Sequence, residues 1–293
     1  MQVEISFLGE HRARLGESPL WDDARACLWW VDAIAQRIRA ADLDGKLLAE
    51  FTADQPVGSI GLADGGLIVA LADGFYLLNA TNGRMECLAR VPGDRTGRRL
   101  NDGKVDPAGR FVCGDFASDC PEGGTVWQIH SAGRIRAIEQ GVKIANAICF
   151  APDGAAMYLA DSLEGVLRRY PYDPATGDLG ARADLVDCNT LGSAPDGATN
   201  DTAGNVWTTL VMAQALACFS PGGELLHRIA LPVPYPSCPA FGGKARDILF
   251  ATSISDSGHR IRVDHPDGGR IMVIRGLRAT GLPEPRFGIN NHE

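Results

Sequence analysis

The sequence has no apolar run long enough to span a bilayer, which takes roughly 18 to 20 residues. Its first residues, MQVEI, also lack the basic segment and following apolar segment of a secretion signal. Both absences argue against a membrane-anchored or exported protein. We therefore expect a soluble, cytoplasmic protein with no membrane partner.

Positive charge is scarce as well. Lys and Arg together number 28 against 36 Asp and Glu, which gives a net charge of −8. No basic stripe with interleaved aromatic residues occurs, although nucleic-acid-binding surfaces usually carry one. This charge balance predicts that nucleic acid is not a partner.

Zinc, redox and triad motifs are also missing. The eight cysteines are spread along the chain without a Cys-x-x-Cys pair or the companion histidine spacing of a zinc site. We expect reduced thiols that pack as small apolar side chains. None of the six histidines forms an obvious triad with a serine or cysteine, which disfavours nucleophilic catalysis by those residues.

The sequence does contain a repeat. Six times, a polar turn leads into a short apolar or β-branched run, and the equivalent turn residues lie 41, 43, 45, 50 and 42 residues apart. These anchor residues are Arg25, Gly66, Gly109, Gly154, Gly204 and Arg246. A period of roughly 40 to 50 residues with few helix signals is typical of a propeller with one four-stranded blade per repeat.

The repeat therefore predicts an all-β fold, a six-bladed β-propeller, with residues 1–293 as a single domain. A propeller must close its ring, and residues 3–8 alternate in polarity as a strand would. We expect that segment to complete the last blade beside residues 271–274.

The residues eight positions before each anchor should lie on the innermost strands. They are Glu17, Gly58, Asn101, Asn146, Asp196 and Cys238. Four of the six are acids or amides, and equivalent positions of innermost strands converge on the propeller axis. Any one of the four could be an ordinary turn or loop residue, but turn chemistry does not require an acid or amide at one shared register.

Two carboxylates and two amide carbonyls form an all-oxygen set. Such a set suits one hard divalent cation, Ca²⁺, Mg²⁺ or Mn²⁺, while Zn²⁺ stays open because it also accepts carboxylates. Arg99, two residues before Asn101, is a candidate for binding a polyhydroxylated or anionic ligand, or else a surface charge. Asp119, in the loop after the third anchor strand, could accept hydrogen bonds from substrate hydroxyls or simply be solvated.

Several motifs resemble the regucalcin/gluconolactonase family, also called the senescence-marker-protein family, in the same order over nearly the whole chain. They are LGESPLW at 15–21, RLNDGKVD at 99–106, YLADS at 158–162, PDG at 195–197, FGGK at 241–244 and GLPEPRF at 281–287. The resemblance implies a six-bladed propeller that binds one divalent metal and acts on lactones of sugar acids.

By the same resemblance, the metal ligands fall on Glu17, Asn146 and Asp196, and the substrate-contacting residues on Arg99 and Asn101. A family acid that contacts substrate falls on Asp119, where regucalcins have the longer glutamate. The family often has Gly-Thr-Met after the third anchor, whereas this chain has Gly-Asp-Phe at 114–116. That departure bears on the shape of the substrate pocket and not on the metal site.

The implied reaction is attack of water on a metal-polarised lactone carbonyl, with Asp196 as the general base. Two other functions stay open. One is hydrolysis of aryl esters or organophosphates, because an oxygen-lined metal site can polarise either kind of bond. The other is a non-enzymatic calcium-binding propeller. The sequence does not predict the sugar, the metal or the oligomeric state.

Overall fold

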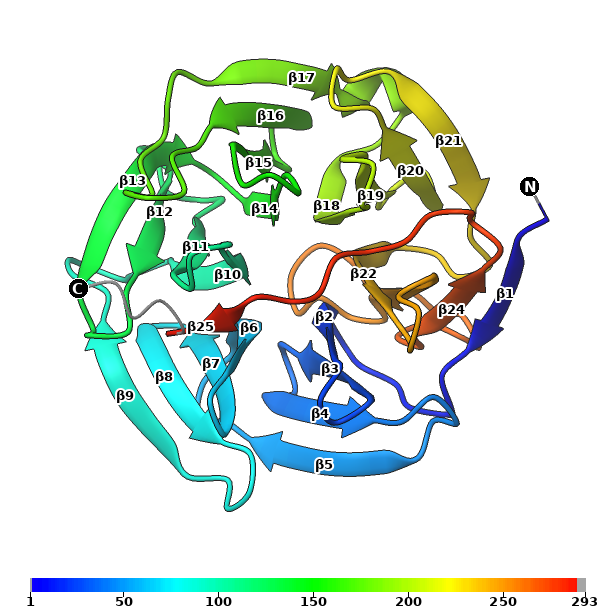
Figure 1. Cartoon of the computed structure of the whole chain (residues 1–293), viewed down its shortest axis with the longest axis horizontal. Helices are drawn as coiled ribbons and strands as arrows, with labels where there is room; N and C mark the ends of the chain where they lie inside the picture. The colour runs from blue at the N-terminus through cyan, green and yellow to red at the C-terminus, as the bar shows by residue number, and fades with distance from the viewer. Residues whose placement is uncertain (1, 289–293) are drawn as a thin grey trace.

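A computed structural model describes residues 2–288. Its β-strands form six sheets arranged as blades around a central axis, and a short 3₁₀ helix, η1 (Cys188–Leu191), follows one of them (Figure 1). The predicted six-bladed β-propeller is confirmed. The described chain contains no helix with the length and apolar character that crossing a membrane requires.

Each blade runs from an innermost strand near the axis to an outer strand at the rim (Figure 1). Blades 1 to 3 hold β2 (Gly16–Asp22), β3 (Cys27–Asp32), β4 (Arg37–Ala41), β5 (Leu47–Thr52); β6 (Val57–Ala63), β7 (Gly66–Leu71), β8 (Gly74–Asn79), β9 (Met85–Arg90); and β10 (Arg99–Val105), β11 (Phe111–Phe116), β12 (Gly124–Ile129), β13 (Ile135–Val142). Blades 4 to 6 hold β14 (Ala145–Phe150), β15 (Ala156–Asp161), β16 (Val166–Pro171), β17 (Ala183–Asp187); β18 (Pro195–Asn200), β19 (Val206–Leu210), β20 (Ala215–Phe219), β21 (Leu225–Ala230); and β22 (Pro236–Gly242), β23 (Ile248–Ser253), β24 (Met272–Arg275), β1 (Glu4–Phe7).

The N-terminal strand closes the ring, as the sequence predicts. β1 pairs antiparallel with β24, with Ile5 opposite Ile274, so it becomes the outer strand of blade 6 (Figure 1). Blade 6 is thus built from both ends of the chain, and its hydrogen bonds hold the first and last blades together.

The hydrophobic core lies between the blades. Six clusters of buried apolar side chains each join two neighbouring blades, and the last of them joins blade 6 to blade 1 through the stacked rings of Trp21 and Phe250. All six residues of β3, β7 and β15 are buried, because each of these strands packs on both faces. All eight cysteines are free thiols, and six of them are buried.

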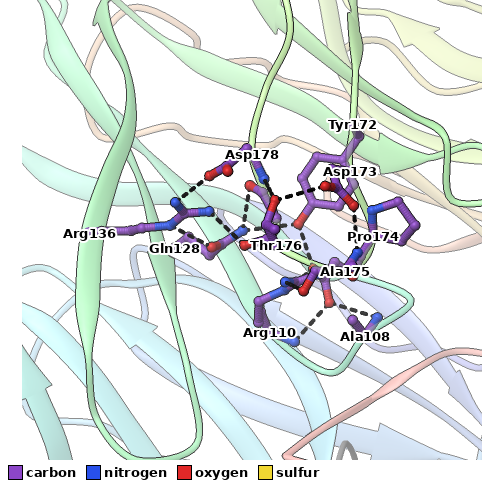
Figure 2. A network of polar contacts seen from close by, with 12 residues as sticks. Ala108, Arg110, Gln128, Arg136, Tyr172, Asp173, Pro174, Ala175, Thr176 and Asp178 are labelled. Carbon is purple, nitrogen blue, oxygen red and sulfur yellow. Dashed lines mark hydrogen bonds and ion pairs between the residues drawn. The ribbon is translucent and has the colours of Figure 1, made fainter. Parts of the chain in front are cut away.

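A polar network ties blade 4 to blade 3 at the rim (Figure 2). The long β16–β17 loop offers the carbonyls of Pro174 and Ala175 to the guanidinium of Arg110. Gln128 donates to the hydroxyl of Tyr172, 3.0 Å away, and accepts from the Nε of Arg136 at 2.8 Å. These contacts fix the interface between the two blades that carry Asn101 and Asn146.

The chain beyond β24 crosses the centre of the ring to reach blade 2 (Figure 1). There β25 (Arg286–Phe287) pairs parallel with β6. The crossing segment is held by an ion pair of 2.7 Å between Lys104 Nζ, on β10, and Glu284 Oε1. It therefore covers the end of the channel at which the innermost strands finish, and leaves the other end for the candidate site.

Candidate metal and substrate site

A cavity of about 550 Å³ opens at the end of the channel where the innermost strands begin. Five of the six predicted site residues line it. They are Glu17, Arg99, Asn101, Asn146 and Asp196. Side chains from β2, β10, β14 and β18 thus meet in one cavity, which is the convergence that the shared register predicts.

A β-bulge lies at the site register of every blade. In each, the pairing between the innermost strand and its neighbour shifts at the same place in the repeat. The shifts fall between Glu17 and Leu20, Val57 and Ser59, Leu100 and Gly103, Asn146 and Cys149, Pro195 and Ala198, and Pro236 and Pro239. A bulge changes the direction of the side chains beside it. At Ser18 and Ala147, directly after two site residues, φ is 49° and 54°, which is uncommon for residues other than glycine.

In blades 2 and 6 the residue at this register supplies no oxygen ligand and has a packing role instead. A Cβ on Gly58 would lie 2.5 Å from the carbonyl oxygen of Leu100, so only glycine allows blade 2 to approach blade 3 so closely. The side chain of Cys238 fills the space that a Cβ on Gly197 would take, at 2.2 Å from its Sγ. The oxygen ligands are therefore confined to blades 1, 3, 4 and 5.

Buried aspartates hold the chain that leads into two of these strands. Asp32 accepts hydrogen bonds from the backbone N–H of Arg14 and of Leu15, at 2.8 and 3.3 Å. Asp161 accepts in the same way from Lys143 and Ile144, at 2.7 and 3.2 Å. Each carboxylate fixes the backbone two residues before a site residue, Glu17 or Asn146, and so fixes where that side chain begins.

The amides form a chain of hydrogen bonds across the site. Arg99 Nη1 donates to Asn101 Oδ1 at 2.7 Å, and Asn101 Nδ2 donates to Asn146 Oδ1 at 2.9 Å. Asn146 Nδ2 then donates to the hydroxyl of Ser162 at 2.8 Å, and Ser162 donates to the carbonyl of Pro195 at 2.7 Å. Both amides are thereby oriented with their nitrogens engaged by protein acceptors, and Asn146 Oδ1, which accepts from Asn101, keeps a second lone pair that a cation could use. Nothing in the sequence pattern marks Ser162 as a member of this chain of hydrogen bonds.

Burial and neighbouring acids disfavour the ionised forms of the two carboxyls at the site. Burial raises the pKa of Glu17 well above its ordinary value, and Asp196 and Asp102 raise it further, against an opposing effect of Arg99. Burial and Asp102 likewise raise the pKa of Asp196. Buried like charges of this kind are stabilised when a cation binds between them.

The residues present therefore fit a divalent cation. Glu17 and Asp196 supply the charge, and Asn146 supplies a neutral oxygen. No group of three or more His, Cys, Asp or Glu side chains within residues 2–288 is placed to hold a metal. The candidate set of two carboxylates and an amide is one that hard cations accept and that zinc sites rarely use.

Asp102 is a site residue that sequence analysis missed, because Asn-Asp-Gly has the composition of an ordinary turn. Its carboxylate accepts from the backbone N–H of Ile148 at 2.8 Å and of Gly103 at 2.9 Å, which links β10 to β14 beside the site. Burial raises its pKa to about 6. Asp102 acts on Glu17 and Asp196 through space and does not line the cavity.

The departure at residues 114–116 has a physical explanation. Asp115 is buried and binds both terminal nitrogens of Arg95, at 2.8 and 3.1 Å. That pair anchors the segment that leads into Arg99 at the start of β10. The guanidinium of Arg99 lies 4.6 Å from the ring centre of Phe116, a cation–π contact. Asp115 and Phe116, the two residues that differ from the family pattern, thus help to hold Arg99 at the cavity wall.

Asp119 lies beside residues of the cavity mouth but does not itself line the cavity. Its side chain is 72% exposed, and its oxygens are 3.9 Å from His259 Nε2 and 3.8 Å from Arg260 Nη2. Both partners come from the connection between β23 and β24 and do line the cavity. Contact of Asp119 with a substrate hydroxyl stays a prediction.

Comparison with known proteins identifies relatives along the whole chain. The family described as SMP-30/Gluconolactonase/LRE-like region matches residues 15–255. A 6-deoxy-6-sulfogluconolactonase of Pseudomonas putida is 34% identical over 277 residues, covering 93% of this chain and 94% of the relative. Regucalcin of Gallus gallus is 30% identical, covering 97% of this chain and 98% of the relative. The crystal structure of a calcium-binding regucalcin from Agrobacterium tumefaciens superposes with a TM-score of 0.88 at 25% identity, over 97% of each chain.

Proposed function

Since this chain belongs to the SMP-30/gluconolactonase/LRE-like family, we propose that it is a divalent-metal-dependent hydrolase of sugar-acid lactones. It would open the lactone ring to the free aldonic acid. The names of relatives, gluconolactonase and sulfogluconolactonase among them, support hydrolysis of a sugar lactone. The proposal treats residues 1–293 as one domain, in keeping with a ring closed by β1 and β24.

The observation that carries the proposal is the pair of carboxyls, half-buried Glu17 and buried Asp196, in a cavity that Asn146 also lines. These three residues would hold the metal, and likeness to the calcium-binding regucalcin of Agrobacterium tumefaciens supports a hard cation such as Ca²⁺. When bound, such a cation supplies Lewis-acid polarisation of the lactone carbonyl. The choice among Ca²⁺, Mg²⁺, Mn²⁺ and Zn²⁺ is left to experiment.

The protein's own groups would do the rest. Asp196, a carboxylate in the same cavity, would take a proton from the attacking water. The oxygen of that water bonds to the carbonyl carbon of the lactone. The bond between that carbon and the ring oxygen then breaks, and the ring oxygen receives a proton. Arg99 and Asn101 would orient the substrate, because their hydrogen bond and the Phe116 contact already fix their positions.

A panel of substrates tests the proposal against hydrolysis of other bonds. Aldonolactones, aryl esters and phosphotriesters are compared with the same metal-loaded protein, after subtraction of spontaneous hydrolysis. We expect kcat/KM to be highest for an aldonolactone. A higher value for an aryl ester or phosphotriester would refute the substrate class, and tight metal binding without any turnover would favour a calcium-binding propeller.

A further inference from the structure

The mouth of the cavity carries positive charge, opposite to its acidic interior. Glu17 and Asp196 stand on the innermost strands, whereas His259 and Arg260 line the mouth from the connection between β23 and β24. Arg99 adds a second guanidinium to the same wall. A substrate whose carbonyl reaches the two carboxyls would extend its far end toward the cationic residues.

The loop that carries these residues is anchored at several points. Asp256 forms an ion pair of 2.8 Å with Arg14, and the hydroxyl of Ser257 accepts from the backbone N–H of Ile261 at 3.0 Å. The ring of His259 packs edge-on against Phe116, with ring centres 6.2 Å apart at 85°. His259 and Arg260 are therefore presented at a defined place at the mouth, beside blade 3.

The charge of Arg260 is incompletely paired. Among residues 2–288, Asp119 is the acid that lies within ion-pair distance of His259 and Arg260, and it serves both. Its separations of 3.9 and 3.8 Å are too long for hydrogen bonds, and its side chain is 72% exposed to screening solvent. The N–H groups of Arg260 thus remain available to an anion that enters the cavity.

Part of the cavity wall offers little to sugar hydroxyls. It is formed by apolar side chains from blades 4 and 5, namely Ile144, Leu163, Val211 and Met212. Leu163 and Met212 are among the most exposed large apolar residues of the described chain. Hydroxyl recognition along that wall is weak, so a charged group held by the cationic side is the stronger means of orienting a substrate.

We infer that the substrate is a sugar lactone that bears an oxyanion group, sulfonate or phosphate, at the carbon farthest from the lactone carbonyl, and that Arg260 and His259 bind this group. The inference rests on the proposed lactonase function. A guanidinium matches a tetrahedral oxyanion with two parallel N–H donors. Asp119 then acts as a counter-ion that competes with the substrate, and not as an acceptor for its hydroxyls.

Three lactones with the same ring test the inference in the metal-loaded full-length protein. They are D-glucono-1,5-lactone and its 6-phospho and 6-deoxy-6-sulfo derivatives, each corrected for its own spontaneous hydrolysis. The measured quantity is the ratio of kcat/KM for each charged lactone to that for the neutral one. We expect at least one ratio to exceed about tenfold and to fall as ionic strength rises. Comparison of the ratios for the phospho and sulfo lactones shows which oxyanion the protein prefers.

Variants at the cavity mouth separate the role of Arg260 from that of Asp119. Arg260→Gln should lower the ratio about tenfold, as for loss of a hydrogen bond to a charged group, and Asp119→Asn should raise it. Arg262→Gln, a neighbouring exposed arginine outside the cavity lining, should leave the ratio unchanged. Equal hydrolysis of all three lactones, with no change of ratio in Arg260→Gln, would overturn the inference alone. Failure to hydrolyse any of the three would overturn the proposed function with it.

Discussion

Replacing Glu17 by glutamine should stabilise the metal-free protein while removing its response to metal. Burial and neighbouring carboxyls raise the pKa of Glu17, so its ionised form is penalised in the fold. Each tenfold weakening of the acid corresponds to about 1.4 kcal/mol of lost stability at a pH above both its unfolded and its folded pKa. For a protein of this size, about 1.4 kcal/mol corresponds to roughly 2 °C in Tm. Glutamine keeps the shape and carries no charge to penalise.

The sign of the pH dependence follows from the raised pKa. Below the ordinary glutamate pKa both states of Glu17 are protonated, and the variant gains nothing. As pH rises through the ordinary value toward the raised one, the wild-type protein loses stability and the variant does not. The difference in Tm should therefore grow from acid to neutral pH.

Metal reverses the order of stability. A ligand at 100 times its Kd stabilises the folded state by about 2.7 kcal/mol, or roughly 4 °C here. Differential scanning fluorimetry with chelator and then with Ca²⁺ or Mg²⁺ should show this rise in the wild type and in Glu224→Gln, an exposed control. Glu17→Gln should show none. A variant that melts below wild type without metal at neutral pH, yet gains as much from metal, would refute the reasoning.

Three other substitutions probe the site and the far end of the channel. Asp196→Ala should abolish both cation binding by calorimetry and lactone hydrolysis in a pH-stat, and full activity would contradict its role. Asn101→Ala should lower kcat/KM about tenfold, since it removes the bond that orients Asn146; an unchanged value would exclude that bond from function. Glu284→Gln leaves Lys104 without its carboxylate and should lower the free energy of unfolding in urea by about 3 kcal/mol with KM unchanged. A loss below about 0.5 kcal/mol would show that this pair is no stronger than a surface pair.

The sequence was sufficient for the fold because the propeller repeats. A period set by turns such as those at Gly109 and Gly154 fixes the number of blades, and one shared register placed Glu17, Asn146 and Asp196 in one cavity. Polarity alternation at residues 3–8 was enough to predict how the ring closes, because only an amphipathic outer strand fits there.

The rest depended on contacts between distant blades. Nothing in the composition of Asn-Asp-Gly distinguishes a turn from the half-buried Asp102 that raises the pKa of its neighbours. The bulges at the site register arise from pairing between strands, which a single strand's sequence does not reveal. The cationic mouth forms only because the β23–β24 connection of blade 6 meets Phe116 and Asp119 of blade 3.

The most direct test of a metal-dependent lactonase is the rate of aldonolactone hydrolysis by chelator-treated protein, before and after adding Ca²⁺, Mg²⁺, Mn²⁺ or Zn²⁺. We predict hydrolysis at the spontaneous rate in chelator, and a large increase with at least one cation that Glu17→Gln does not show. Full turnover in the presence of chelator would contradict the metal requirement. Absence of turnover with all four cations would contradict the lactonase itself.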